Sequence, residues 1–163
     1  MNIMLAEHAH AEKLSEIIQA TFHLACPENS DQNLQSLYIA KHLSAKHFKQ
    51  FISDNQHQVW VAIDSNIPIG LAVLDSNCEP YPMLSKLYVH PNYQGEGVAQ
   101  KLYKAVTDHV KKLGYQALNL SVYSGNLKAK TFYEKKGFKL IGCCDFKMET
   151  EIHKDHIYQR LLA

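Results

Sequence analysis

The 163 residues correspond to one domain of ordinary size, and their 46% hydrophobic and 20% charged residues indicate a globular rather than a disordered chain. The formal net charge of +1 gives no overall field that would attract nucleic acid, a membrane surface or an anionic polymer. The four cysteines form no CxxC pair, so we expect reduced thiols, no metal site and a cytoplasmic location. No signal peptide is recognisable at the start of the sequence. We therefore expect residues 1–163 to form a single domain.

The first half of the chain predicts a strand, three helices and then three strands. The predicted elements are a strand at residues 2–5, helices at 8–22, 30–41 and 44–53, and strands at 58–63, 68–74 and 83–89. In the first helix Leu14, Ile18 and Phe22 share one face, which is the spacing of an amphipathic helix. Ser44 is a candidate N-cap for the third helix.

The second half alternates helices and strands. The predicted elements are a helix at residues 98–113, a strand at 117–122, a helix at 126–136, and terminal strands at 138–148 and 151–162. Gly114 and Gly137 stand where residues that end a helix are expected, and Asn126 can cap the helix that follows it. The element order indicates an α/β fold in which helices cover a mixed sheet.

A loop with two glycines joins the strand at 83–89 to the helix at 98–113. The first N–H groups of a helix have no acceptor within the helix, and they lie at the positive end of its dipole. Because Gly95 and Gly97 carry no Cβ, a phosphate can approach the backbone closely, so this loop predicts an anion site that suits a pyrophosphate.

Three phosphate-binding patterns compete for this loop. A P-loop requires Gly-Lys-Ser/Thr, which is absent, and the dinucleotide pattern GxGxxG fails because its third glycine is replaced by Gln100. The pattern Gln/Arg-x-x-Gly-x-Gly/Ala is matched by Gln94, Gly97 and Ala99. A second motif, N-x-x-A-x-x-F-Y-E-K-x-G-F, occupies residues 126–138, after one predicted helix and one predicted strand.

With these two motifs in this order, the chain resembles the GNAT family of N-acetyltransferases. The resemblance implies a mixed, mostly antiparallel sheet of six to seven strands, with helices on both faces and a V-shaped split between the two central strands. It implies acetyl-CoA as the cosubstrate and direct attack by a primary amine in a ternary complex. Because members of the family are often dimers, it also implies a homodimer.

The resemblance assigns roles to individual residues. The residues that it implies for coenzyme binding are Leu87, Tyr88, Val89, Gln94, Gly95, Glu96, Gly97, Val98, Ala99, Asn126 and Tyr133. A bulge near residues 86–89 would splay this strand from residues 118–122, so that the pantetheine arm pairs with it as an added strand. The Val89 N–H would stabilise the oxyanion. Tyr133 would protonate the leaving thiolate, and Asn126 would contact the coenzyme or simply cap its helix.

The chain departs from the family pattern at the general base. An alkyl amine has a pKa near 10.4, so only about one molecule in 2,500 is neutral at pH 7 and a base is useful. Many relatives carry a glutamate where this chain has Ser85, and a serine is not a comparable base. Glu79 is the candidate substitute, acting through water. Tyr123, at the end of a strand, either lines the cleft or packs in the core.

The acceptor in this family is selected by the N-terminal helices and the terminal hairpin, here roughly residues 22–53 and 146–158. Their spacing resembles that of bacterial spermidine/spermine acetyltransferases of the Pai type. A polyamine would need carboxylates, and Glu28, Asp31 and Asp54 are candidates. The alternatives are a protein N-terminus, a lysine side chain, a small amine antibiotic, or a coenzyme-binding sensor without turnover.

Overall fold

The computed structural model describes residues 1–162 of the chain. In this part of the chain, seven strands form one sheet in the spatial order β1-β2-β3-β4-β5-β7-β6. The elements are β1 (Asn2–Leu5), η1 (His8–His10), α1 (Ala11–Thr21), η2 (Phe22–Ala25), α2 (Gln32–His42), α3 (Ala45–Ser53), β2 (His57–Asp64), β3 (Ile67–Asp75), β4 (Met83–Val89), η3 (Pro91–Tyr93), α4 (Val98–Lys112), β5 (Ala117–Tyr123), α5 (Leu127–Lys135), β6 (Lys139–Met148) and β7 (Glu151–Leu161).

The helices begin and end where local signals place them. The predicted helix at residues 8–22 is α1 with a short 3₁₀ turn at each end, which is common at helix termini. Asp31 caps α2 by accepting hydrogen bonds from the N–H groups of Asn33 (2.7 Å) and Leu34 (3.4 Å), so this helix begins at Gln32 rather than at residue 30.

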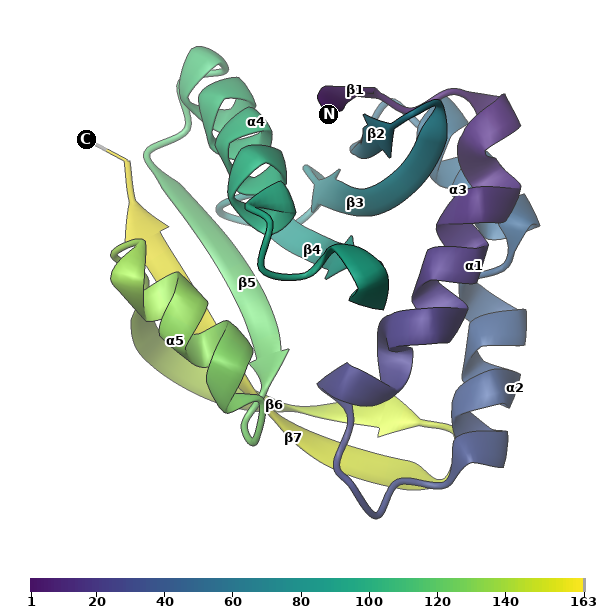
Figure 1. Ribbon diagram of the computed structural model, residues 1–163. Helices are drawn as coiled ribbons and strands as arrows, with labels where there is room; N and C mark the ends of the chain where they lie inside the picture. The colour runs from purple at the N-terminus through teal and green to yellow at the C-terminus, as the bar shows by residue number, and fades with distance from the viewer. Residues whose placement is uncertain (163) are drawn as a thin grey trace.

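Two sets of helices cover the two faces of the sheet (Figure 1). Helices α4 and α5 pack on one face, where Leu102, Val106, Leu118, Leu120 and Tyr158 are almost fully buried. Helices α1, α2 and α3 pack on the other face, where Leu14, Ile18, Phe48, Val61 and Leu71 are fully buried. The predicted α/β fold, with a mixed, mostly antiparallel sheet between helices, is confirmed.

The sheet is split between β4 and β5. Neighbouring strands pair antiparallel except these two, which run parallel and pair only at Met83–Asn119 and Leu84–Leu120. Beyond those pairs the strands diverge, which produces the V shape visible in Figure 1. The predicted bulge near residues 86–89 lies one residue earlier, at Ser85, which has no partner on β3 and bends β4 away from β5.

None of the helices in residues 1–162 is long and apolar enough to cross a membrane.

Candidate functional site

The loop between β4 and α4 forms a cradle of main-chain groups. Gly95 and Gly97 have φ angles of +83° and +80°, a conformation that side chains disfavour. A Cβ atom placed on either glycine would meet no heavy atom of the protein within 4 Å. Gly97 occupies the N-cap position of the 15-residue helix α4, so no side chain satisfies the first N–H groups, and the first turn holds no acidic residue. The loop therefore presents free N–H donors and a positive helix end to an anion.

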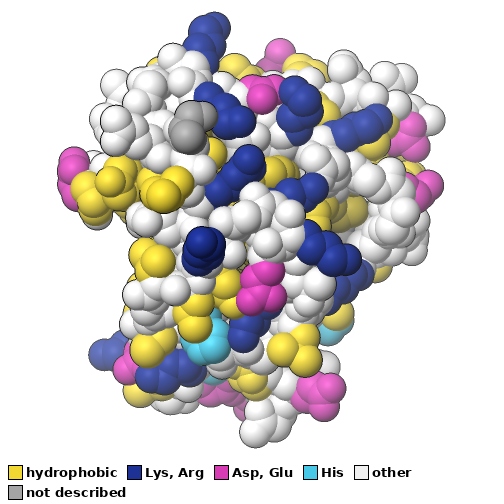
Figure 2. Space-filling model, turned by 90° about the vertical axis from the view of Figure 1, so that its left-hand side faces the viewer, with side chains coloured by type: hydrophobic (Ala, Val, Ile, Leu, Met, Phe, Trp, Pro, Cys, Tyr) yellow, Lys and Arg dark blue, Asp and Glu magenta, His cyan; other side chains and the backbone are white. Residues whose placement is uncertain are grey.

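One cation of α5 and one from the residue that follows it lie near this loop and the first turn of α4. The Nζ of Lys128 donates to the side-chain oxygen of Gln94 at 3.2 Å, and Lys136 donates to Gln100 in the first turn of α4. Figure 2 shows that Lys and Arg side chains gather over this face of the molecule. Lys135, Lys136 and Arg160 also line a cavity of about 400 Å³ beside α4. Lysine and arginine side chains therefore outnumber the carboxylates of Glu96 and Asp108 along this side of α4, although the whole chain carries only +1.

The open edge of β4 presents main-chain groups to the split. The N–H of His90 donates to Ile69 of β3 at 2.8 Å. Because the main-chain groups of successive strand residues point to opposite edges, those of Val89 and Leu87 point away from β3, into the split, whereas those of Tyr88 point toward β3. Leu87 and Val89 are therefore oriented so that their main-chain groups could pair with an added strand, whereas the main-chain groups of Tyr88 are not.

Tyr133 lies on the inner face of α5, and 9% of its surface is exposed. Its ring packs edge-on against Phe132 and Phe138, at centroid distances of 5.3 and 5.5 Å. Burial, together with the nearby hydroxyls of Tyr88 and Tyr103, raises the pKa of Tyr133, so the phenol stays protonated at neutral pH, as an acid must. The Asn126 side chain accepts from the N–H of Ala129 at 3.2 Å, which is its predicted cap.

Aromatic side chains gather on the opposite face of the sheet, beside the split. Tyr38 of α2 lies 5.3 Å from Phe146 of β6, which in turn lies 5.8 Å from His153 of β7, measured between ring centroids. Tyr123 of β5 lies 6.2 Å from the same histidine ring. Tyr123 is half-buried and belongs to this cluster rather than to the core. These residues come from four elements and share no local motif, which is why sequence reasoning missed all of them except Tyr123.

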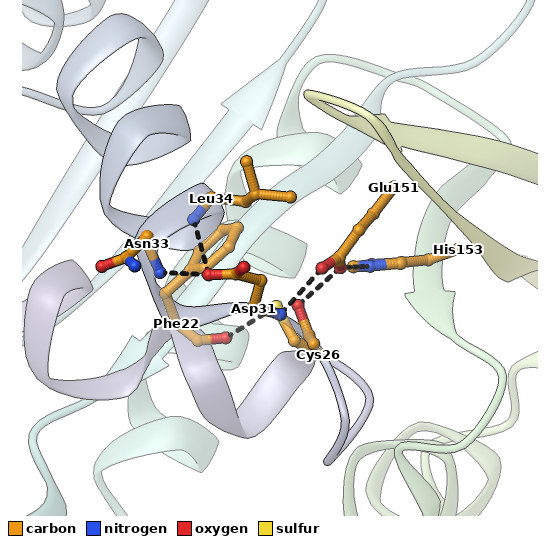
Figure 3. A network of polar contacts seen from close by, with 8 residues as sticks. Phe22, Cys26, Asp31, Asn33, Leu34, Glu151 and His153 are labelled. Carbon is orange, nitrogen blue, oxygen red and sulfur yellow. Dashed lines mark hydrogen bonds and ion pairs between the residues drawn. The ribbon is translucent and has the colours of Figure 1, made fainter.

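Glu151, at the start of β7, fastens the segment between η2 and α2 to the sheet (Figure 3). Its carboxylate accepts hydrogen bonds from the Ser30 hydroxyl (2.7 Å), the Asp31 N–H (2.7 Å) and the His153 ring (2.8 Å). These bonds, the Asp31 N–H first, lower the pKa of Glu151 to about 2. The network joins the chain before α2 to β7, the strand that pairs with β5.

We expect Glu151→Gln to reduce the free energy of unfolding by about 1–2 kcal/mol at pH 7, because an amide cannot replace a charged acceptor of three hydrogen bonds. The folded-state pKa of Glu151 lies below its usual 4.5, so its contribution is present above pH 4.5 and is lost as pH falls toward 2. Urea unfolding should therefore show a difference between the two proteins that shrinks as the pH falls below 4.5.

Glu149→Gln is the matched control. Glu149 makes one ion pair, with Lys41 at 2.9 Å, and the Lys41 side chain is largely exposed. We expect that change to cost less than about 1 kcal/mol. Equal losses in the two variants, or a loss in Glu151→Gln that does not depend on pH, would contradict the role of this network.

The three carboxylates suggested for a polyamine do not meet at one place. Asp31 is engaged in capping α2, and Asp54 bonds the His57 ring at 2.8 Å beside α3. Glu28 is exposed in the segment before α2. These positions leave the recognition of a cationic acceptor to other residues.

Two residues bear on the general base: Ser85, which stands where relatives have a glutamate, and Glu79, the candidate substitute. Ser85 is exposed in the bulge and accepts a hydrogen bond from the Lys86 Nζ at 3.1 Å. Burial lowers the pKa of Lys86 to about 8. Glu79 is exposed in the connection before β4, near the Met83 end of the strand. The proposed reaction position is at Val89, at the other end, six residues or about 20 Å of strand away from Met83. Glu79 therefore remains a prediction that this geometry does not favour.

Comparison with known proteins identifies the family. The sequence model of the protein family described as acetyltransferase (GNAT) domain matches residues 25–150. The chain belongs to this family and is an N-acetyltransferase. It is 29% identical over 153 residues to an uncharacterized N-acetyltransferase of Mycobacterium tuberculosis, which covers 94% of this chain and 98% of that protein.

More distant relatives carry substrate names. A spermine/spermidine N(1)-acetyltransferase of Bacillus subtilis is 30% identical over 73 residues, 44% of this chain and 48% of that protein. Among solved structures, the PaiA N-acetyltransferase from Thermoplasma acidophilum in complex with coenzyme A is similar, with a TM-score of 0.83 at 20% identity, covering 99% of this chain and 100% of that one. This likeness shows the fold.

Proposed function

We propose that this N-acetyltransferase moves the acetyl group of acetyl-CoA to a primary amine of a small cationic acceptor, with a polyamine as the first candidate. The observation that carries the proposal is the cradle of main-chain N–H groups between Gln94 and Ala99, open to an anion and placed at the end of a split strand. The family match and the coenzyme A in the PaiA structure support acetyl-CoA as the cosubstrate.

In this proposal the pyrophosphate binds at the Gly95–Gly97 turn, and Lys128 offers a second positive charge. The pantetheine arm enters the split and pairs with Leu87 and Val89, whose main-chain groups point there. This arrangement brings the thioester carbonyl to the Val89 N–H. A fixed donor at an oxyanion contributes about 3 kcal/mol to the lowering of the barrier.

The transfer is a direct attack. The amine nitrogen adds to the thioester carbonyl carbon, and collapse of the adduct breaks the C–S bond. Tyr133 is the candidate acid for the departing sulfur, because its buried phenol remains protonated at neutral pH.

The acceptor proposal rests on similarity and on the local chemistry. The partial relatives that act on spermine and spermidine support a polyamine. The aromatic side chains of Tyr38, Tyr123 and Phe146 beside the split suit a cation. A protein lysine is the second candidate, because a peptidyl-lysine N-acetyltransferase of Salmonella typhimurium is 26% identical over 145 residues, 87% of this chain.

The test is thiol release from acetyl-CoA by the full-length protein with a panel of amines: spermidine, spermine, an aminoglycoside, single amino acids and lysine-containing peptides. We expect spermidine or spermine to raise thiol release well above the rate without amine. A peptide that outperforms every polyamine would transfer the proposal to a protein acceptor. Binding of coenzyme A without amine-dependent release would indicate a sensor and would contradict the enzyme proposal.

A further inference from the structure

A row of side chains crosses the sheet at the level of the proposed reaction centre. Leu84 of β4 pairs with Leu120 of β5, and Ser85 is an extra, bulged residue of β4. When Ser85 is left out of the count, Tyr88 and Tyr123 are each the third residue after this pair, so they lie level with each other across the split. Tyr123 is in turn paired with Asp155 of β7. Cross-strand partners share a face, so Tyr123 and Asp155 lie on the face opposite to the α4 side, as does Tyr88. Because Val89 follows Tyr88 directly, this row passes beside the thioester position.

Asp155 is the carboxylate in this row. It is half-buried, and its Oδ2 accepts a hydrogen bond from the Ser121 hydroxyl at 2.9 Å. It takes part in none of the ion pairs found among residues 1–162. A half-buried carboxylate without a cationic partner has lost hydration that only hydrogen bonds or an incoming cation can replace.

The surroundings of Asp155 extend across the split. Burial is the main cause that raises the pKa values of Cys26 after η2, Tyr38 on α2 and Tyr88 on β4. The charge of Asp155 adds a smaller contribution to each, which places all three within electrostatic reach of it. Burial raises the pKa of Asp155 itself, against the opposing effects of the Ser121 hydroxyl and two histidines. A raised pKa makes a carboxylate a better proton acceptor while it remains ionised at neutral pH.

The aromatic cluster beside Asp155 supplies the other half of a cation site. Faces of Tyr, Phe and Trp rings attract alkylammonium groups, and the attraction increases when water is excluded. His153, which is 5% exposed, closes this cluster between Phe146 and Tyr123, and its Nδ1 is buried without a hydrogen-bond partner. An unsatisfied buried polar atom in a functional region calls for a ligand or water.

Resting on the proposed function, we propose that Asp155 binds the ammonium group of the acceptor and takes its proton, the role for which relatives use a glutamate where this chain has Ser85. The acceptor class that this site selects is a primary alkylamine that arrives as a cation. Glu151, the other carboxylate of β7 on this face, is occupied by three hydrogen bonds.

The proposed transfer moves two protons from the ammonium group and breaks one C–S bond. The ammonium gives one proton to the Asp155 carboxylate, and the freed lone pair forms the C–N bond to the thioester carbonyl carbon. When the adduct collapses, the C–S bond breaks, its electron pair leaves on sulfur, and sulfur takes the Tyr133 proton. The nitrogen of the adduct loses its second proton to the Tyr133 phenolate through water. Asp155 then returns its proton to solvent, so each acetyl transfer releases one proton.

The test compares the full-length wild type with Asp155→Asn, using spermidine and n-butylamine as acceptors and following thiol release. We expect kcat/KM for either amine to fall about 100-fold or more at pH 7, because a general base contributes roughly 10²–10⁴-fold. The Kd for coenzyme A should stay within about twofold. The variant depends on the free amine, so its kcat/KM should rise about tenfold per pH unit below the amine pKa, and its gap to the wild type should narrow.

The matched control is Asp145→Asn. Asp145 is exposed on the neighbouring strand β6, next to Cys144, the residue paired with Asp155, and therefore on the opposite face of the sheet. The kcat/KM of the Asp145→Asn variant should equal that of the wild type. Ser121→Ala is the second variant, because it removes the hydroxyl that orients Asp155 while keeping the carboxylate. We expect it to lose several-fold in kcat/KM.

Three results would overturn the inference. Wild-type kcat/KM in Asp155→Asn would remove the carboxylate from the reaction while the proposed function stands. A loss that is equal at every pH, or that is accompanied by weaker coenzyme binding, would indicate a structural role. If the wild type turned over no amine of the panel, the proposed function would fail, and this inference with it. The other titratable groups around Asp155 are Cys26, Tyr38, Tyr88 and His153 on its own face of the sheet, and His156, the next residue of β7, on the other face.

Discussion

Gly97→Val is expected to weaken coenzyme A binding at least 100-fold. A valine side chain at φ +80° would stand where no protein atom lies within 4 Å of the Cβ position, the space that the pyrophosphate takes in our proposal. It would block several charge-assisted hydrogen bonds, each about 1.5–3 kcal/mol, and 100-fold corresponds to about 2.7 kcal/mol. Titration calorimetry with coenzyme A, alongside thermal unfolding, measures both the affinity and the fold.

The matched control for this prediction is Gly114→Val. Gly114 follows the other end of α4 with a φ of +84°, and it also has open space around its Cβ position. A β-branched residue in this conformation costs about 1–3 kcal/mol at either glycine, so both variants should lose similar stability. Only Gly97→Val should lose the coenzyme. An affinity within tenfold of the wild type in Gly97→Val would remove this loop as the phosphate site.

Tyr133→Phe is expected to lower kcat about 100-fold with little change in the Kd for coenzyme A. The phenylalanine keeps the ring between Phe132 and Phe138, and the lost hydroxyl makes no hydrogen bond to another residue of the described chain. Packing and stability should therefore be preserved, so a loss of turnover reports the proton donor. Removal of a general acid typically costs about 10²–10⁴-fold. Single-turnover thiol release separates this chemical step from binding.

Tyr158→Phe provides the comparison for Tyr133. Tyr158 is also buried on the α4–α5 side of the sheet, and its hydroxyl donates to Glu134 at 3.1 Å, so its loss should affect stability rather than turnover. We expect kcat for that variant within about twofold of the wild type, and a cost of about 1 kcal/mol in unfolding free energy. Full turnover by Tyr133→Phe would show that the leaving thiolate needs no acid from this residue.

Much of the proposed coenzyme site could be predicted from the sequence because its signals are local. A glycine pair, a strand before it and an apolar helical repeat after it lie within about thirty consecutive residues, and short-range sterics decide their conformation. The Asn126 cap was predicted for the same reason, since the capping side chain and the N–H that it accepts are three residues apart.

The position of the β-bulge and the surroundings of the candidate carboxylates depend on contacts between distant segments, which no local sequence pattern specifies. The bulge is at Ser85 because the register between β3 and β4 shifts there, and register depends on the whole sheet. The carboxylates Glu28, Asp31 and Asp54 were candidates by charge alone. In the folded chain Asp31 caps a helix and Asp54 bonds a histidine.

The sequence by itself determined the class of protein, the glycine loop proposed to bind phosphate and the helix that carries Tyr133, because each is specified by neighbours along the chain. The tertiary structure alone decided which carboxylate lies next to β5, the strand that borders the split. Asp155 reaches Tyr123 and Ser121 only through the pairing of β5 with β7, across more than thirty intervening residues. Such contacts form only when distant segments pack together, so their partners cannot be read from the order of residues.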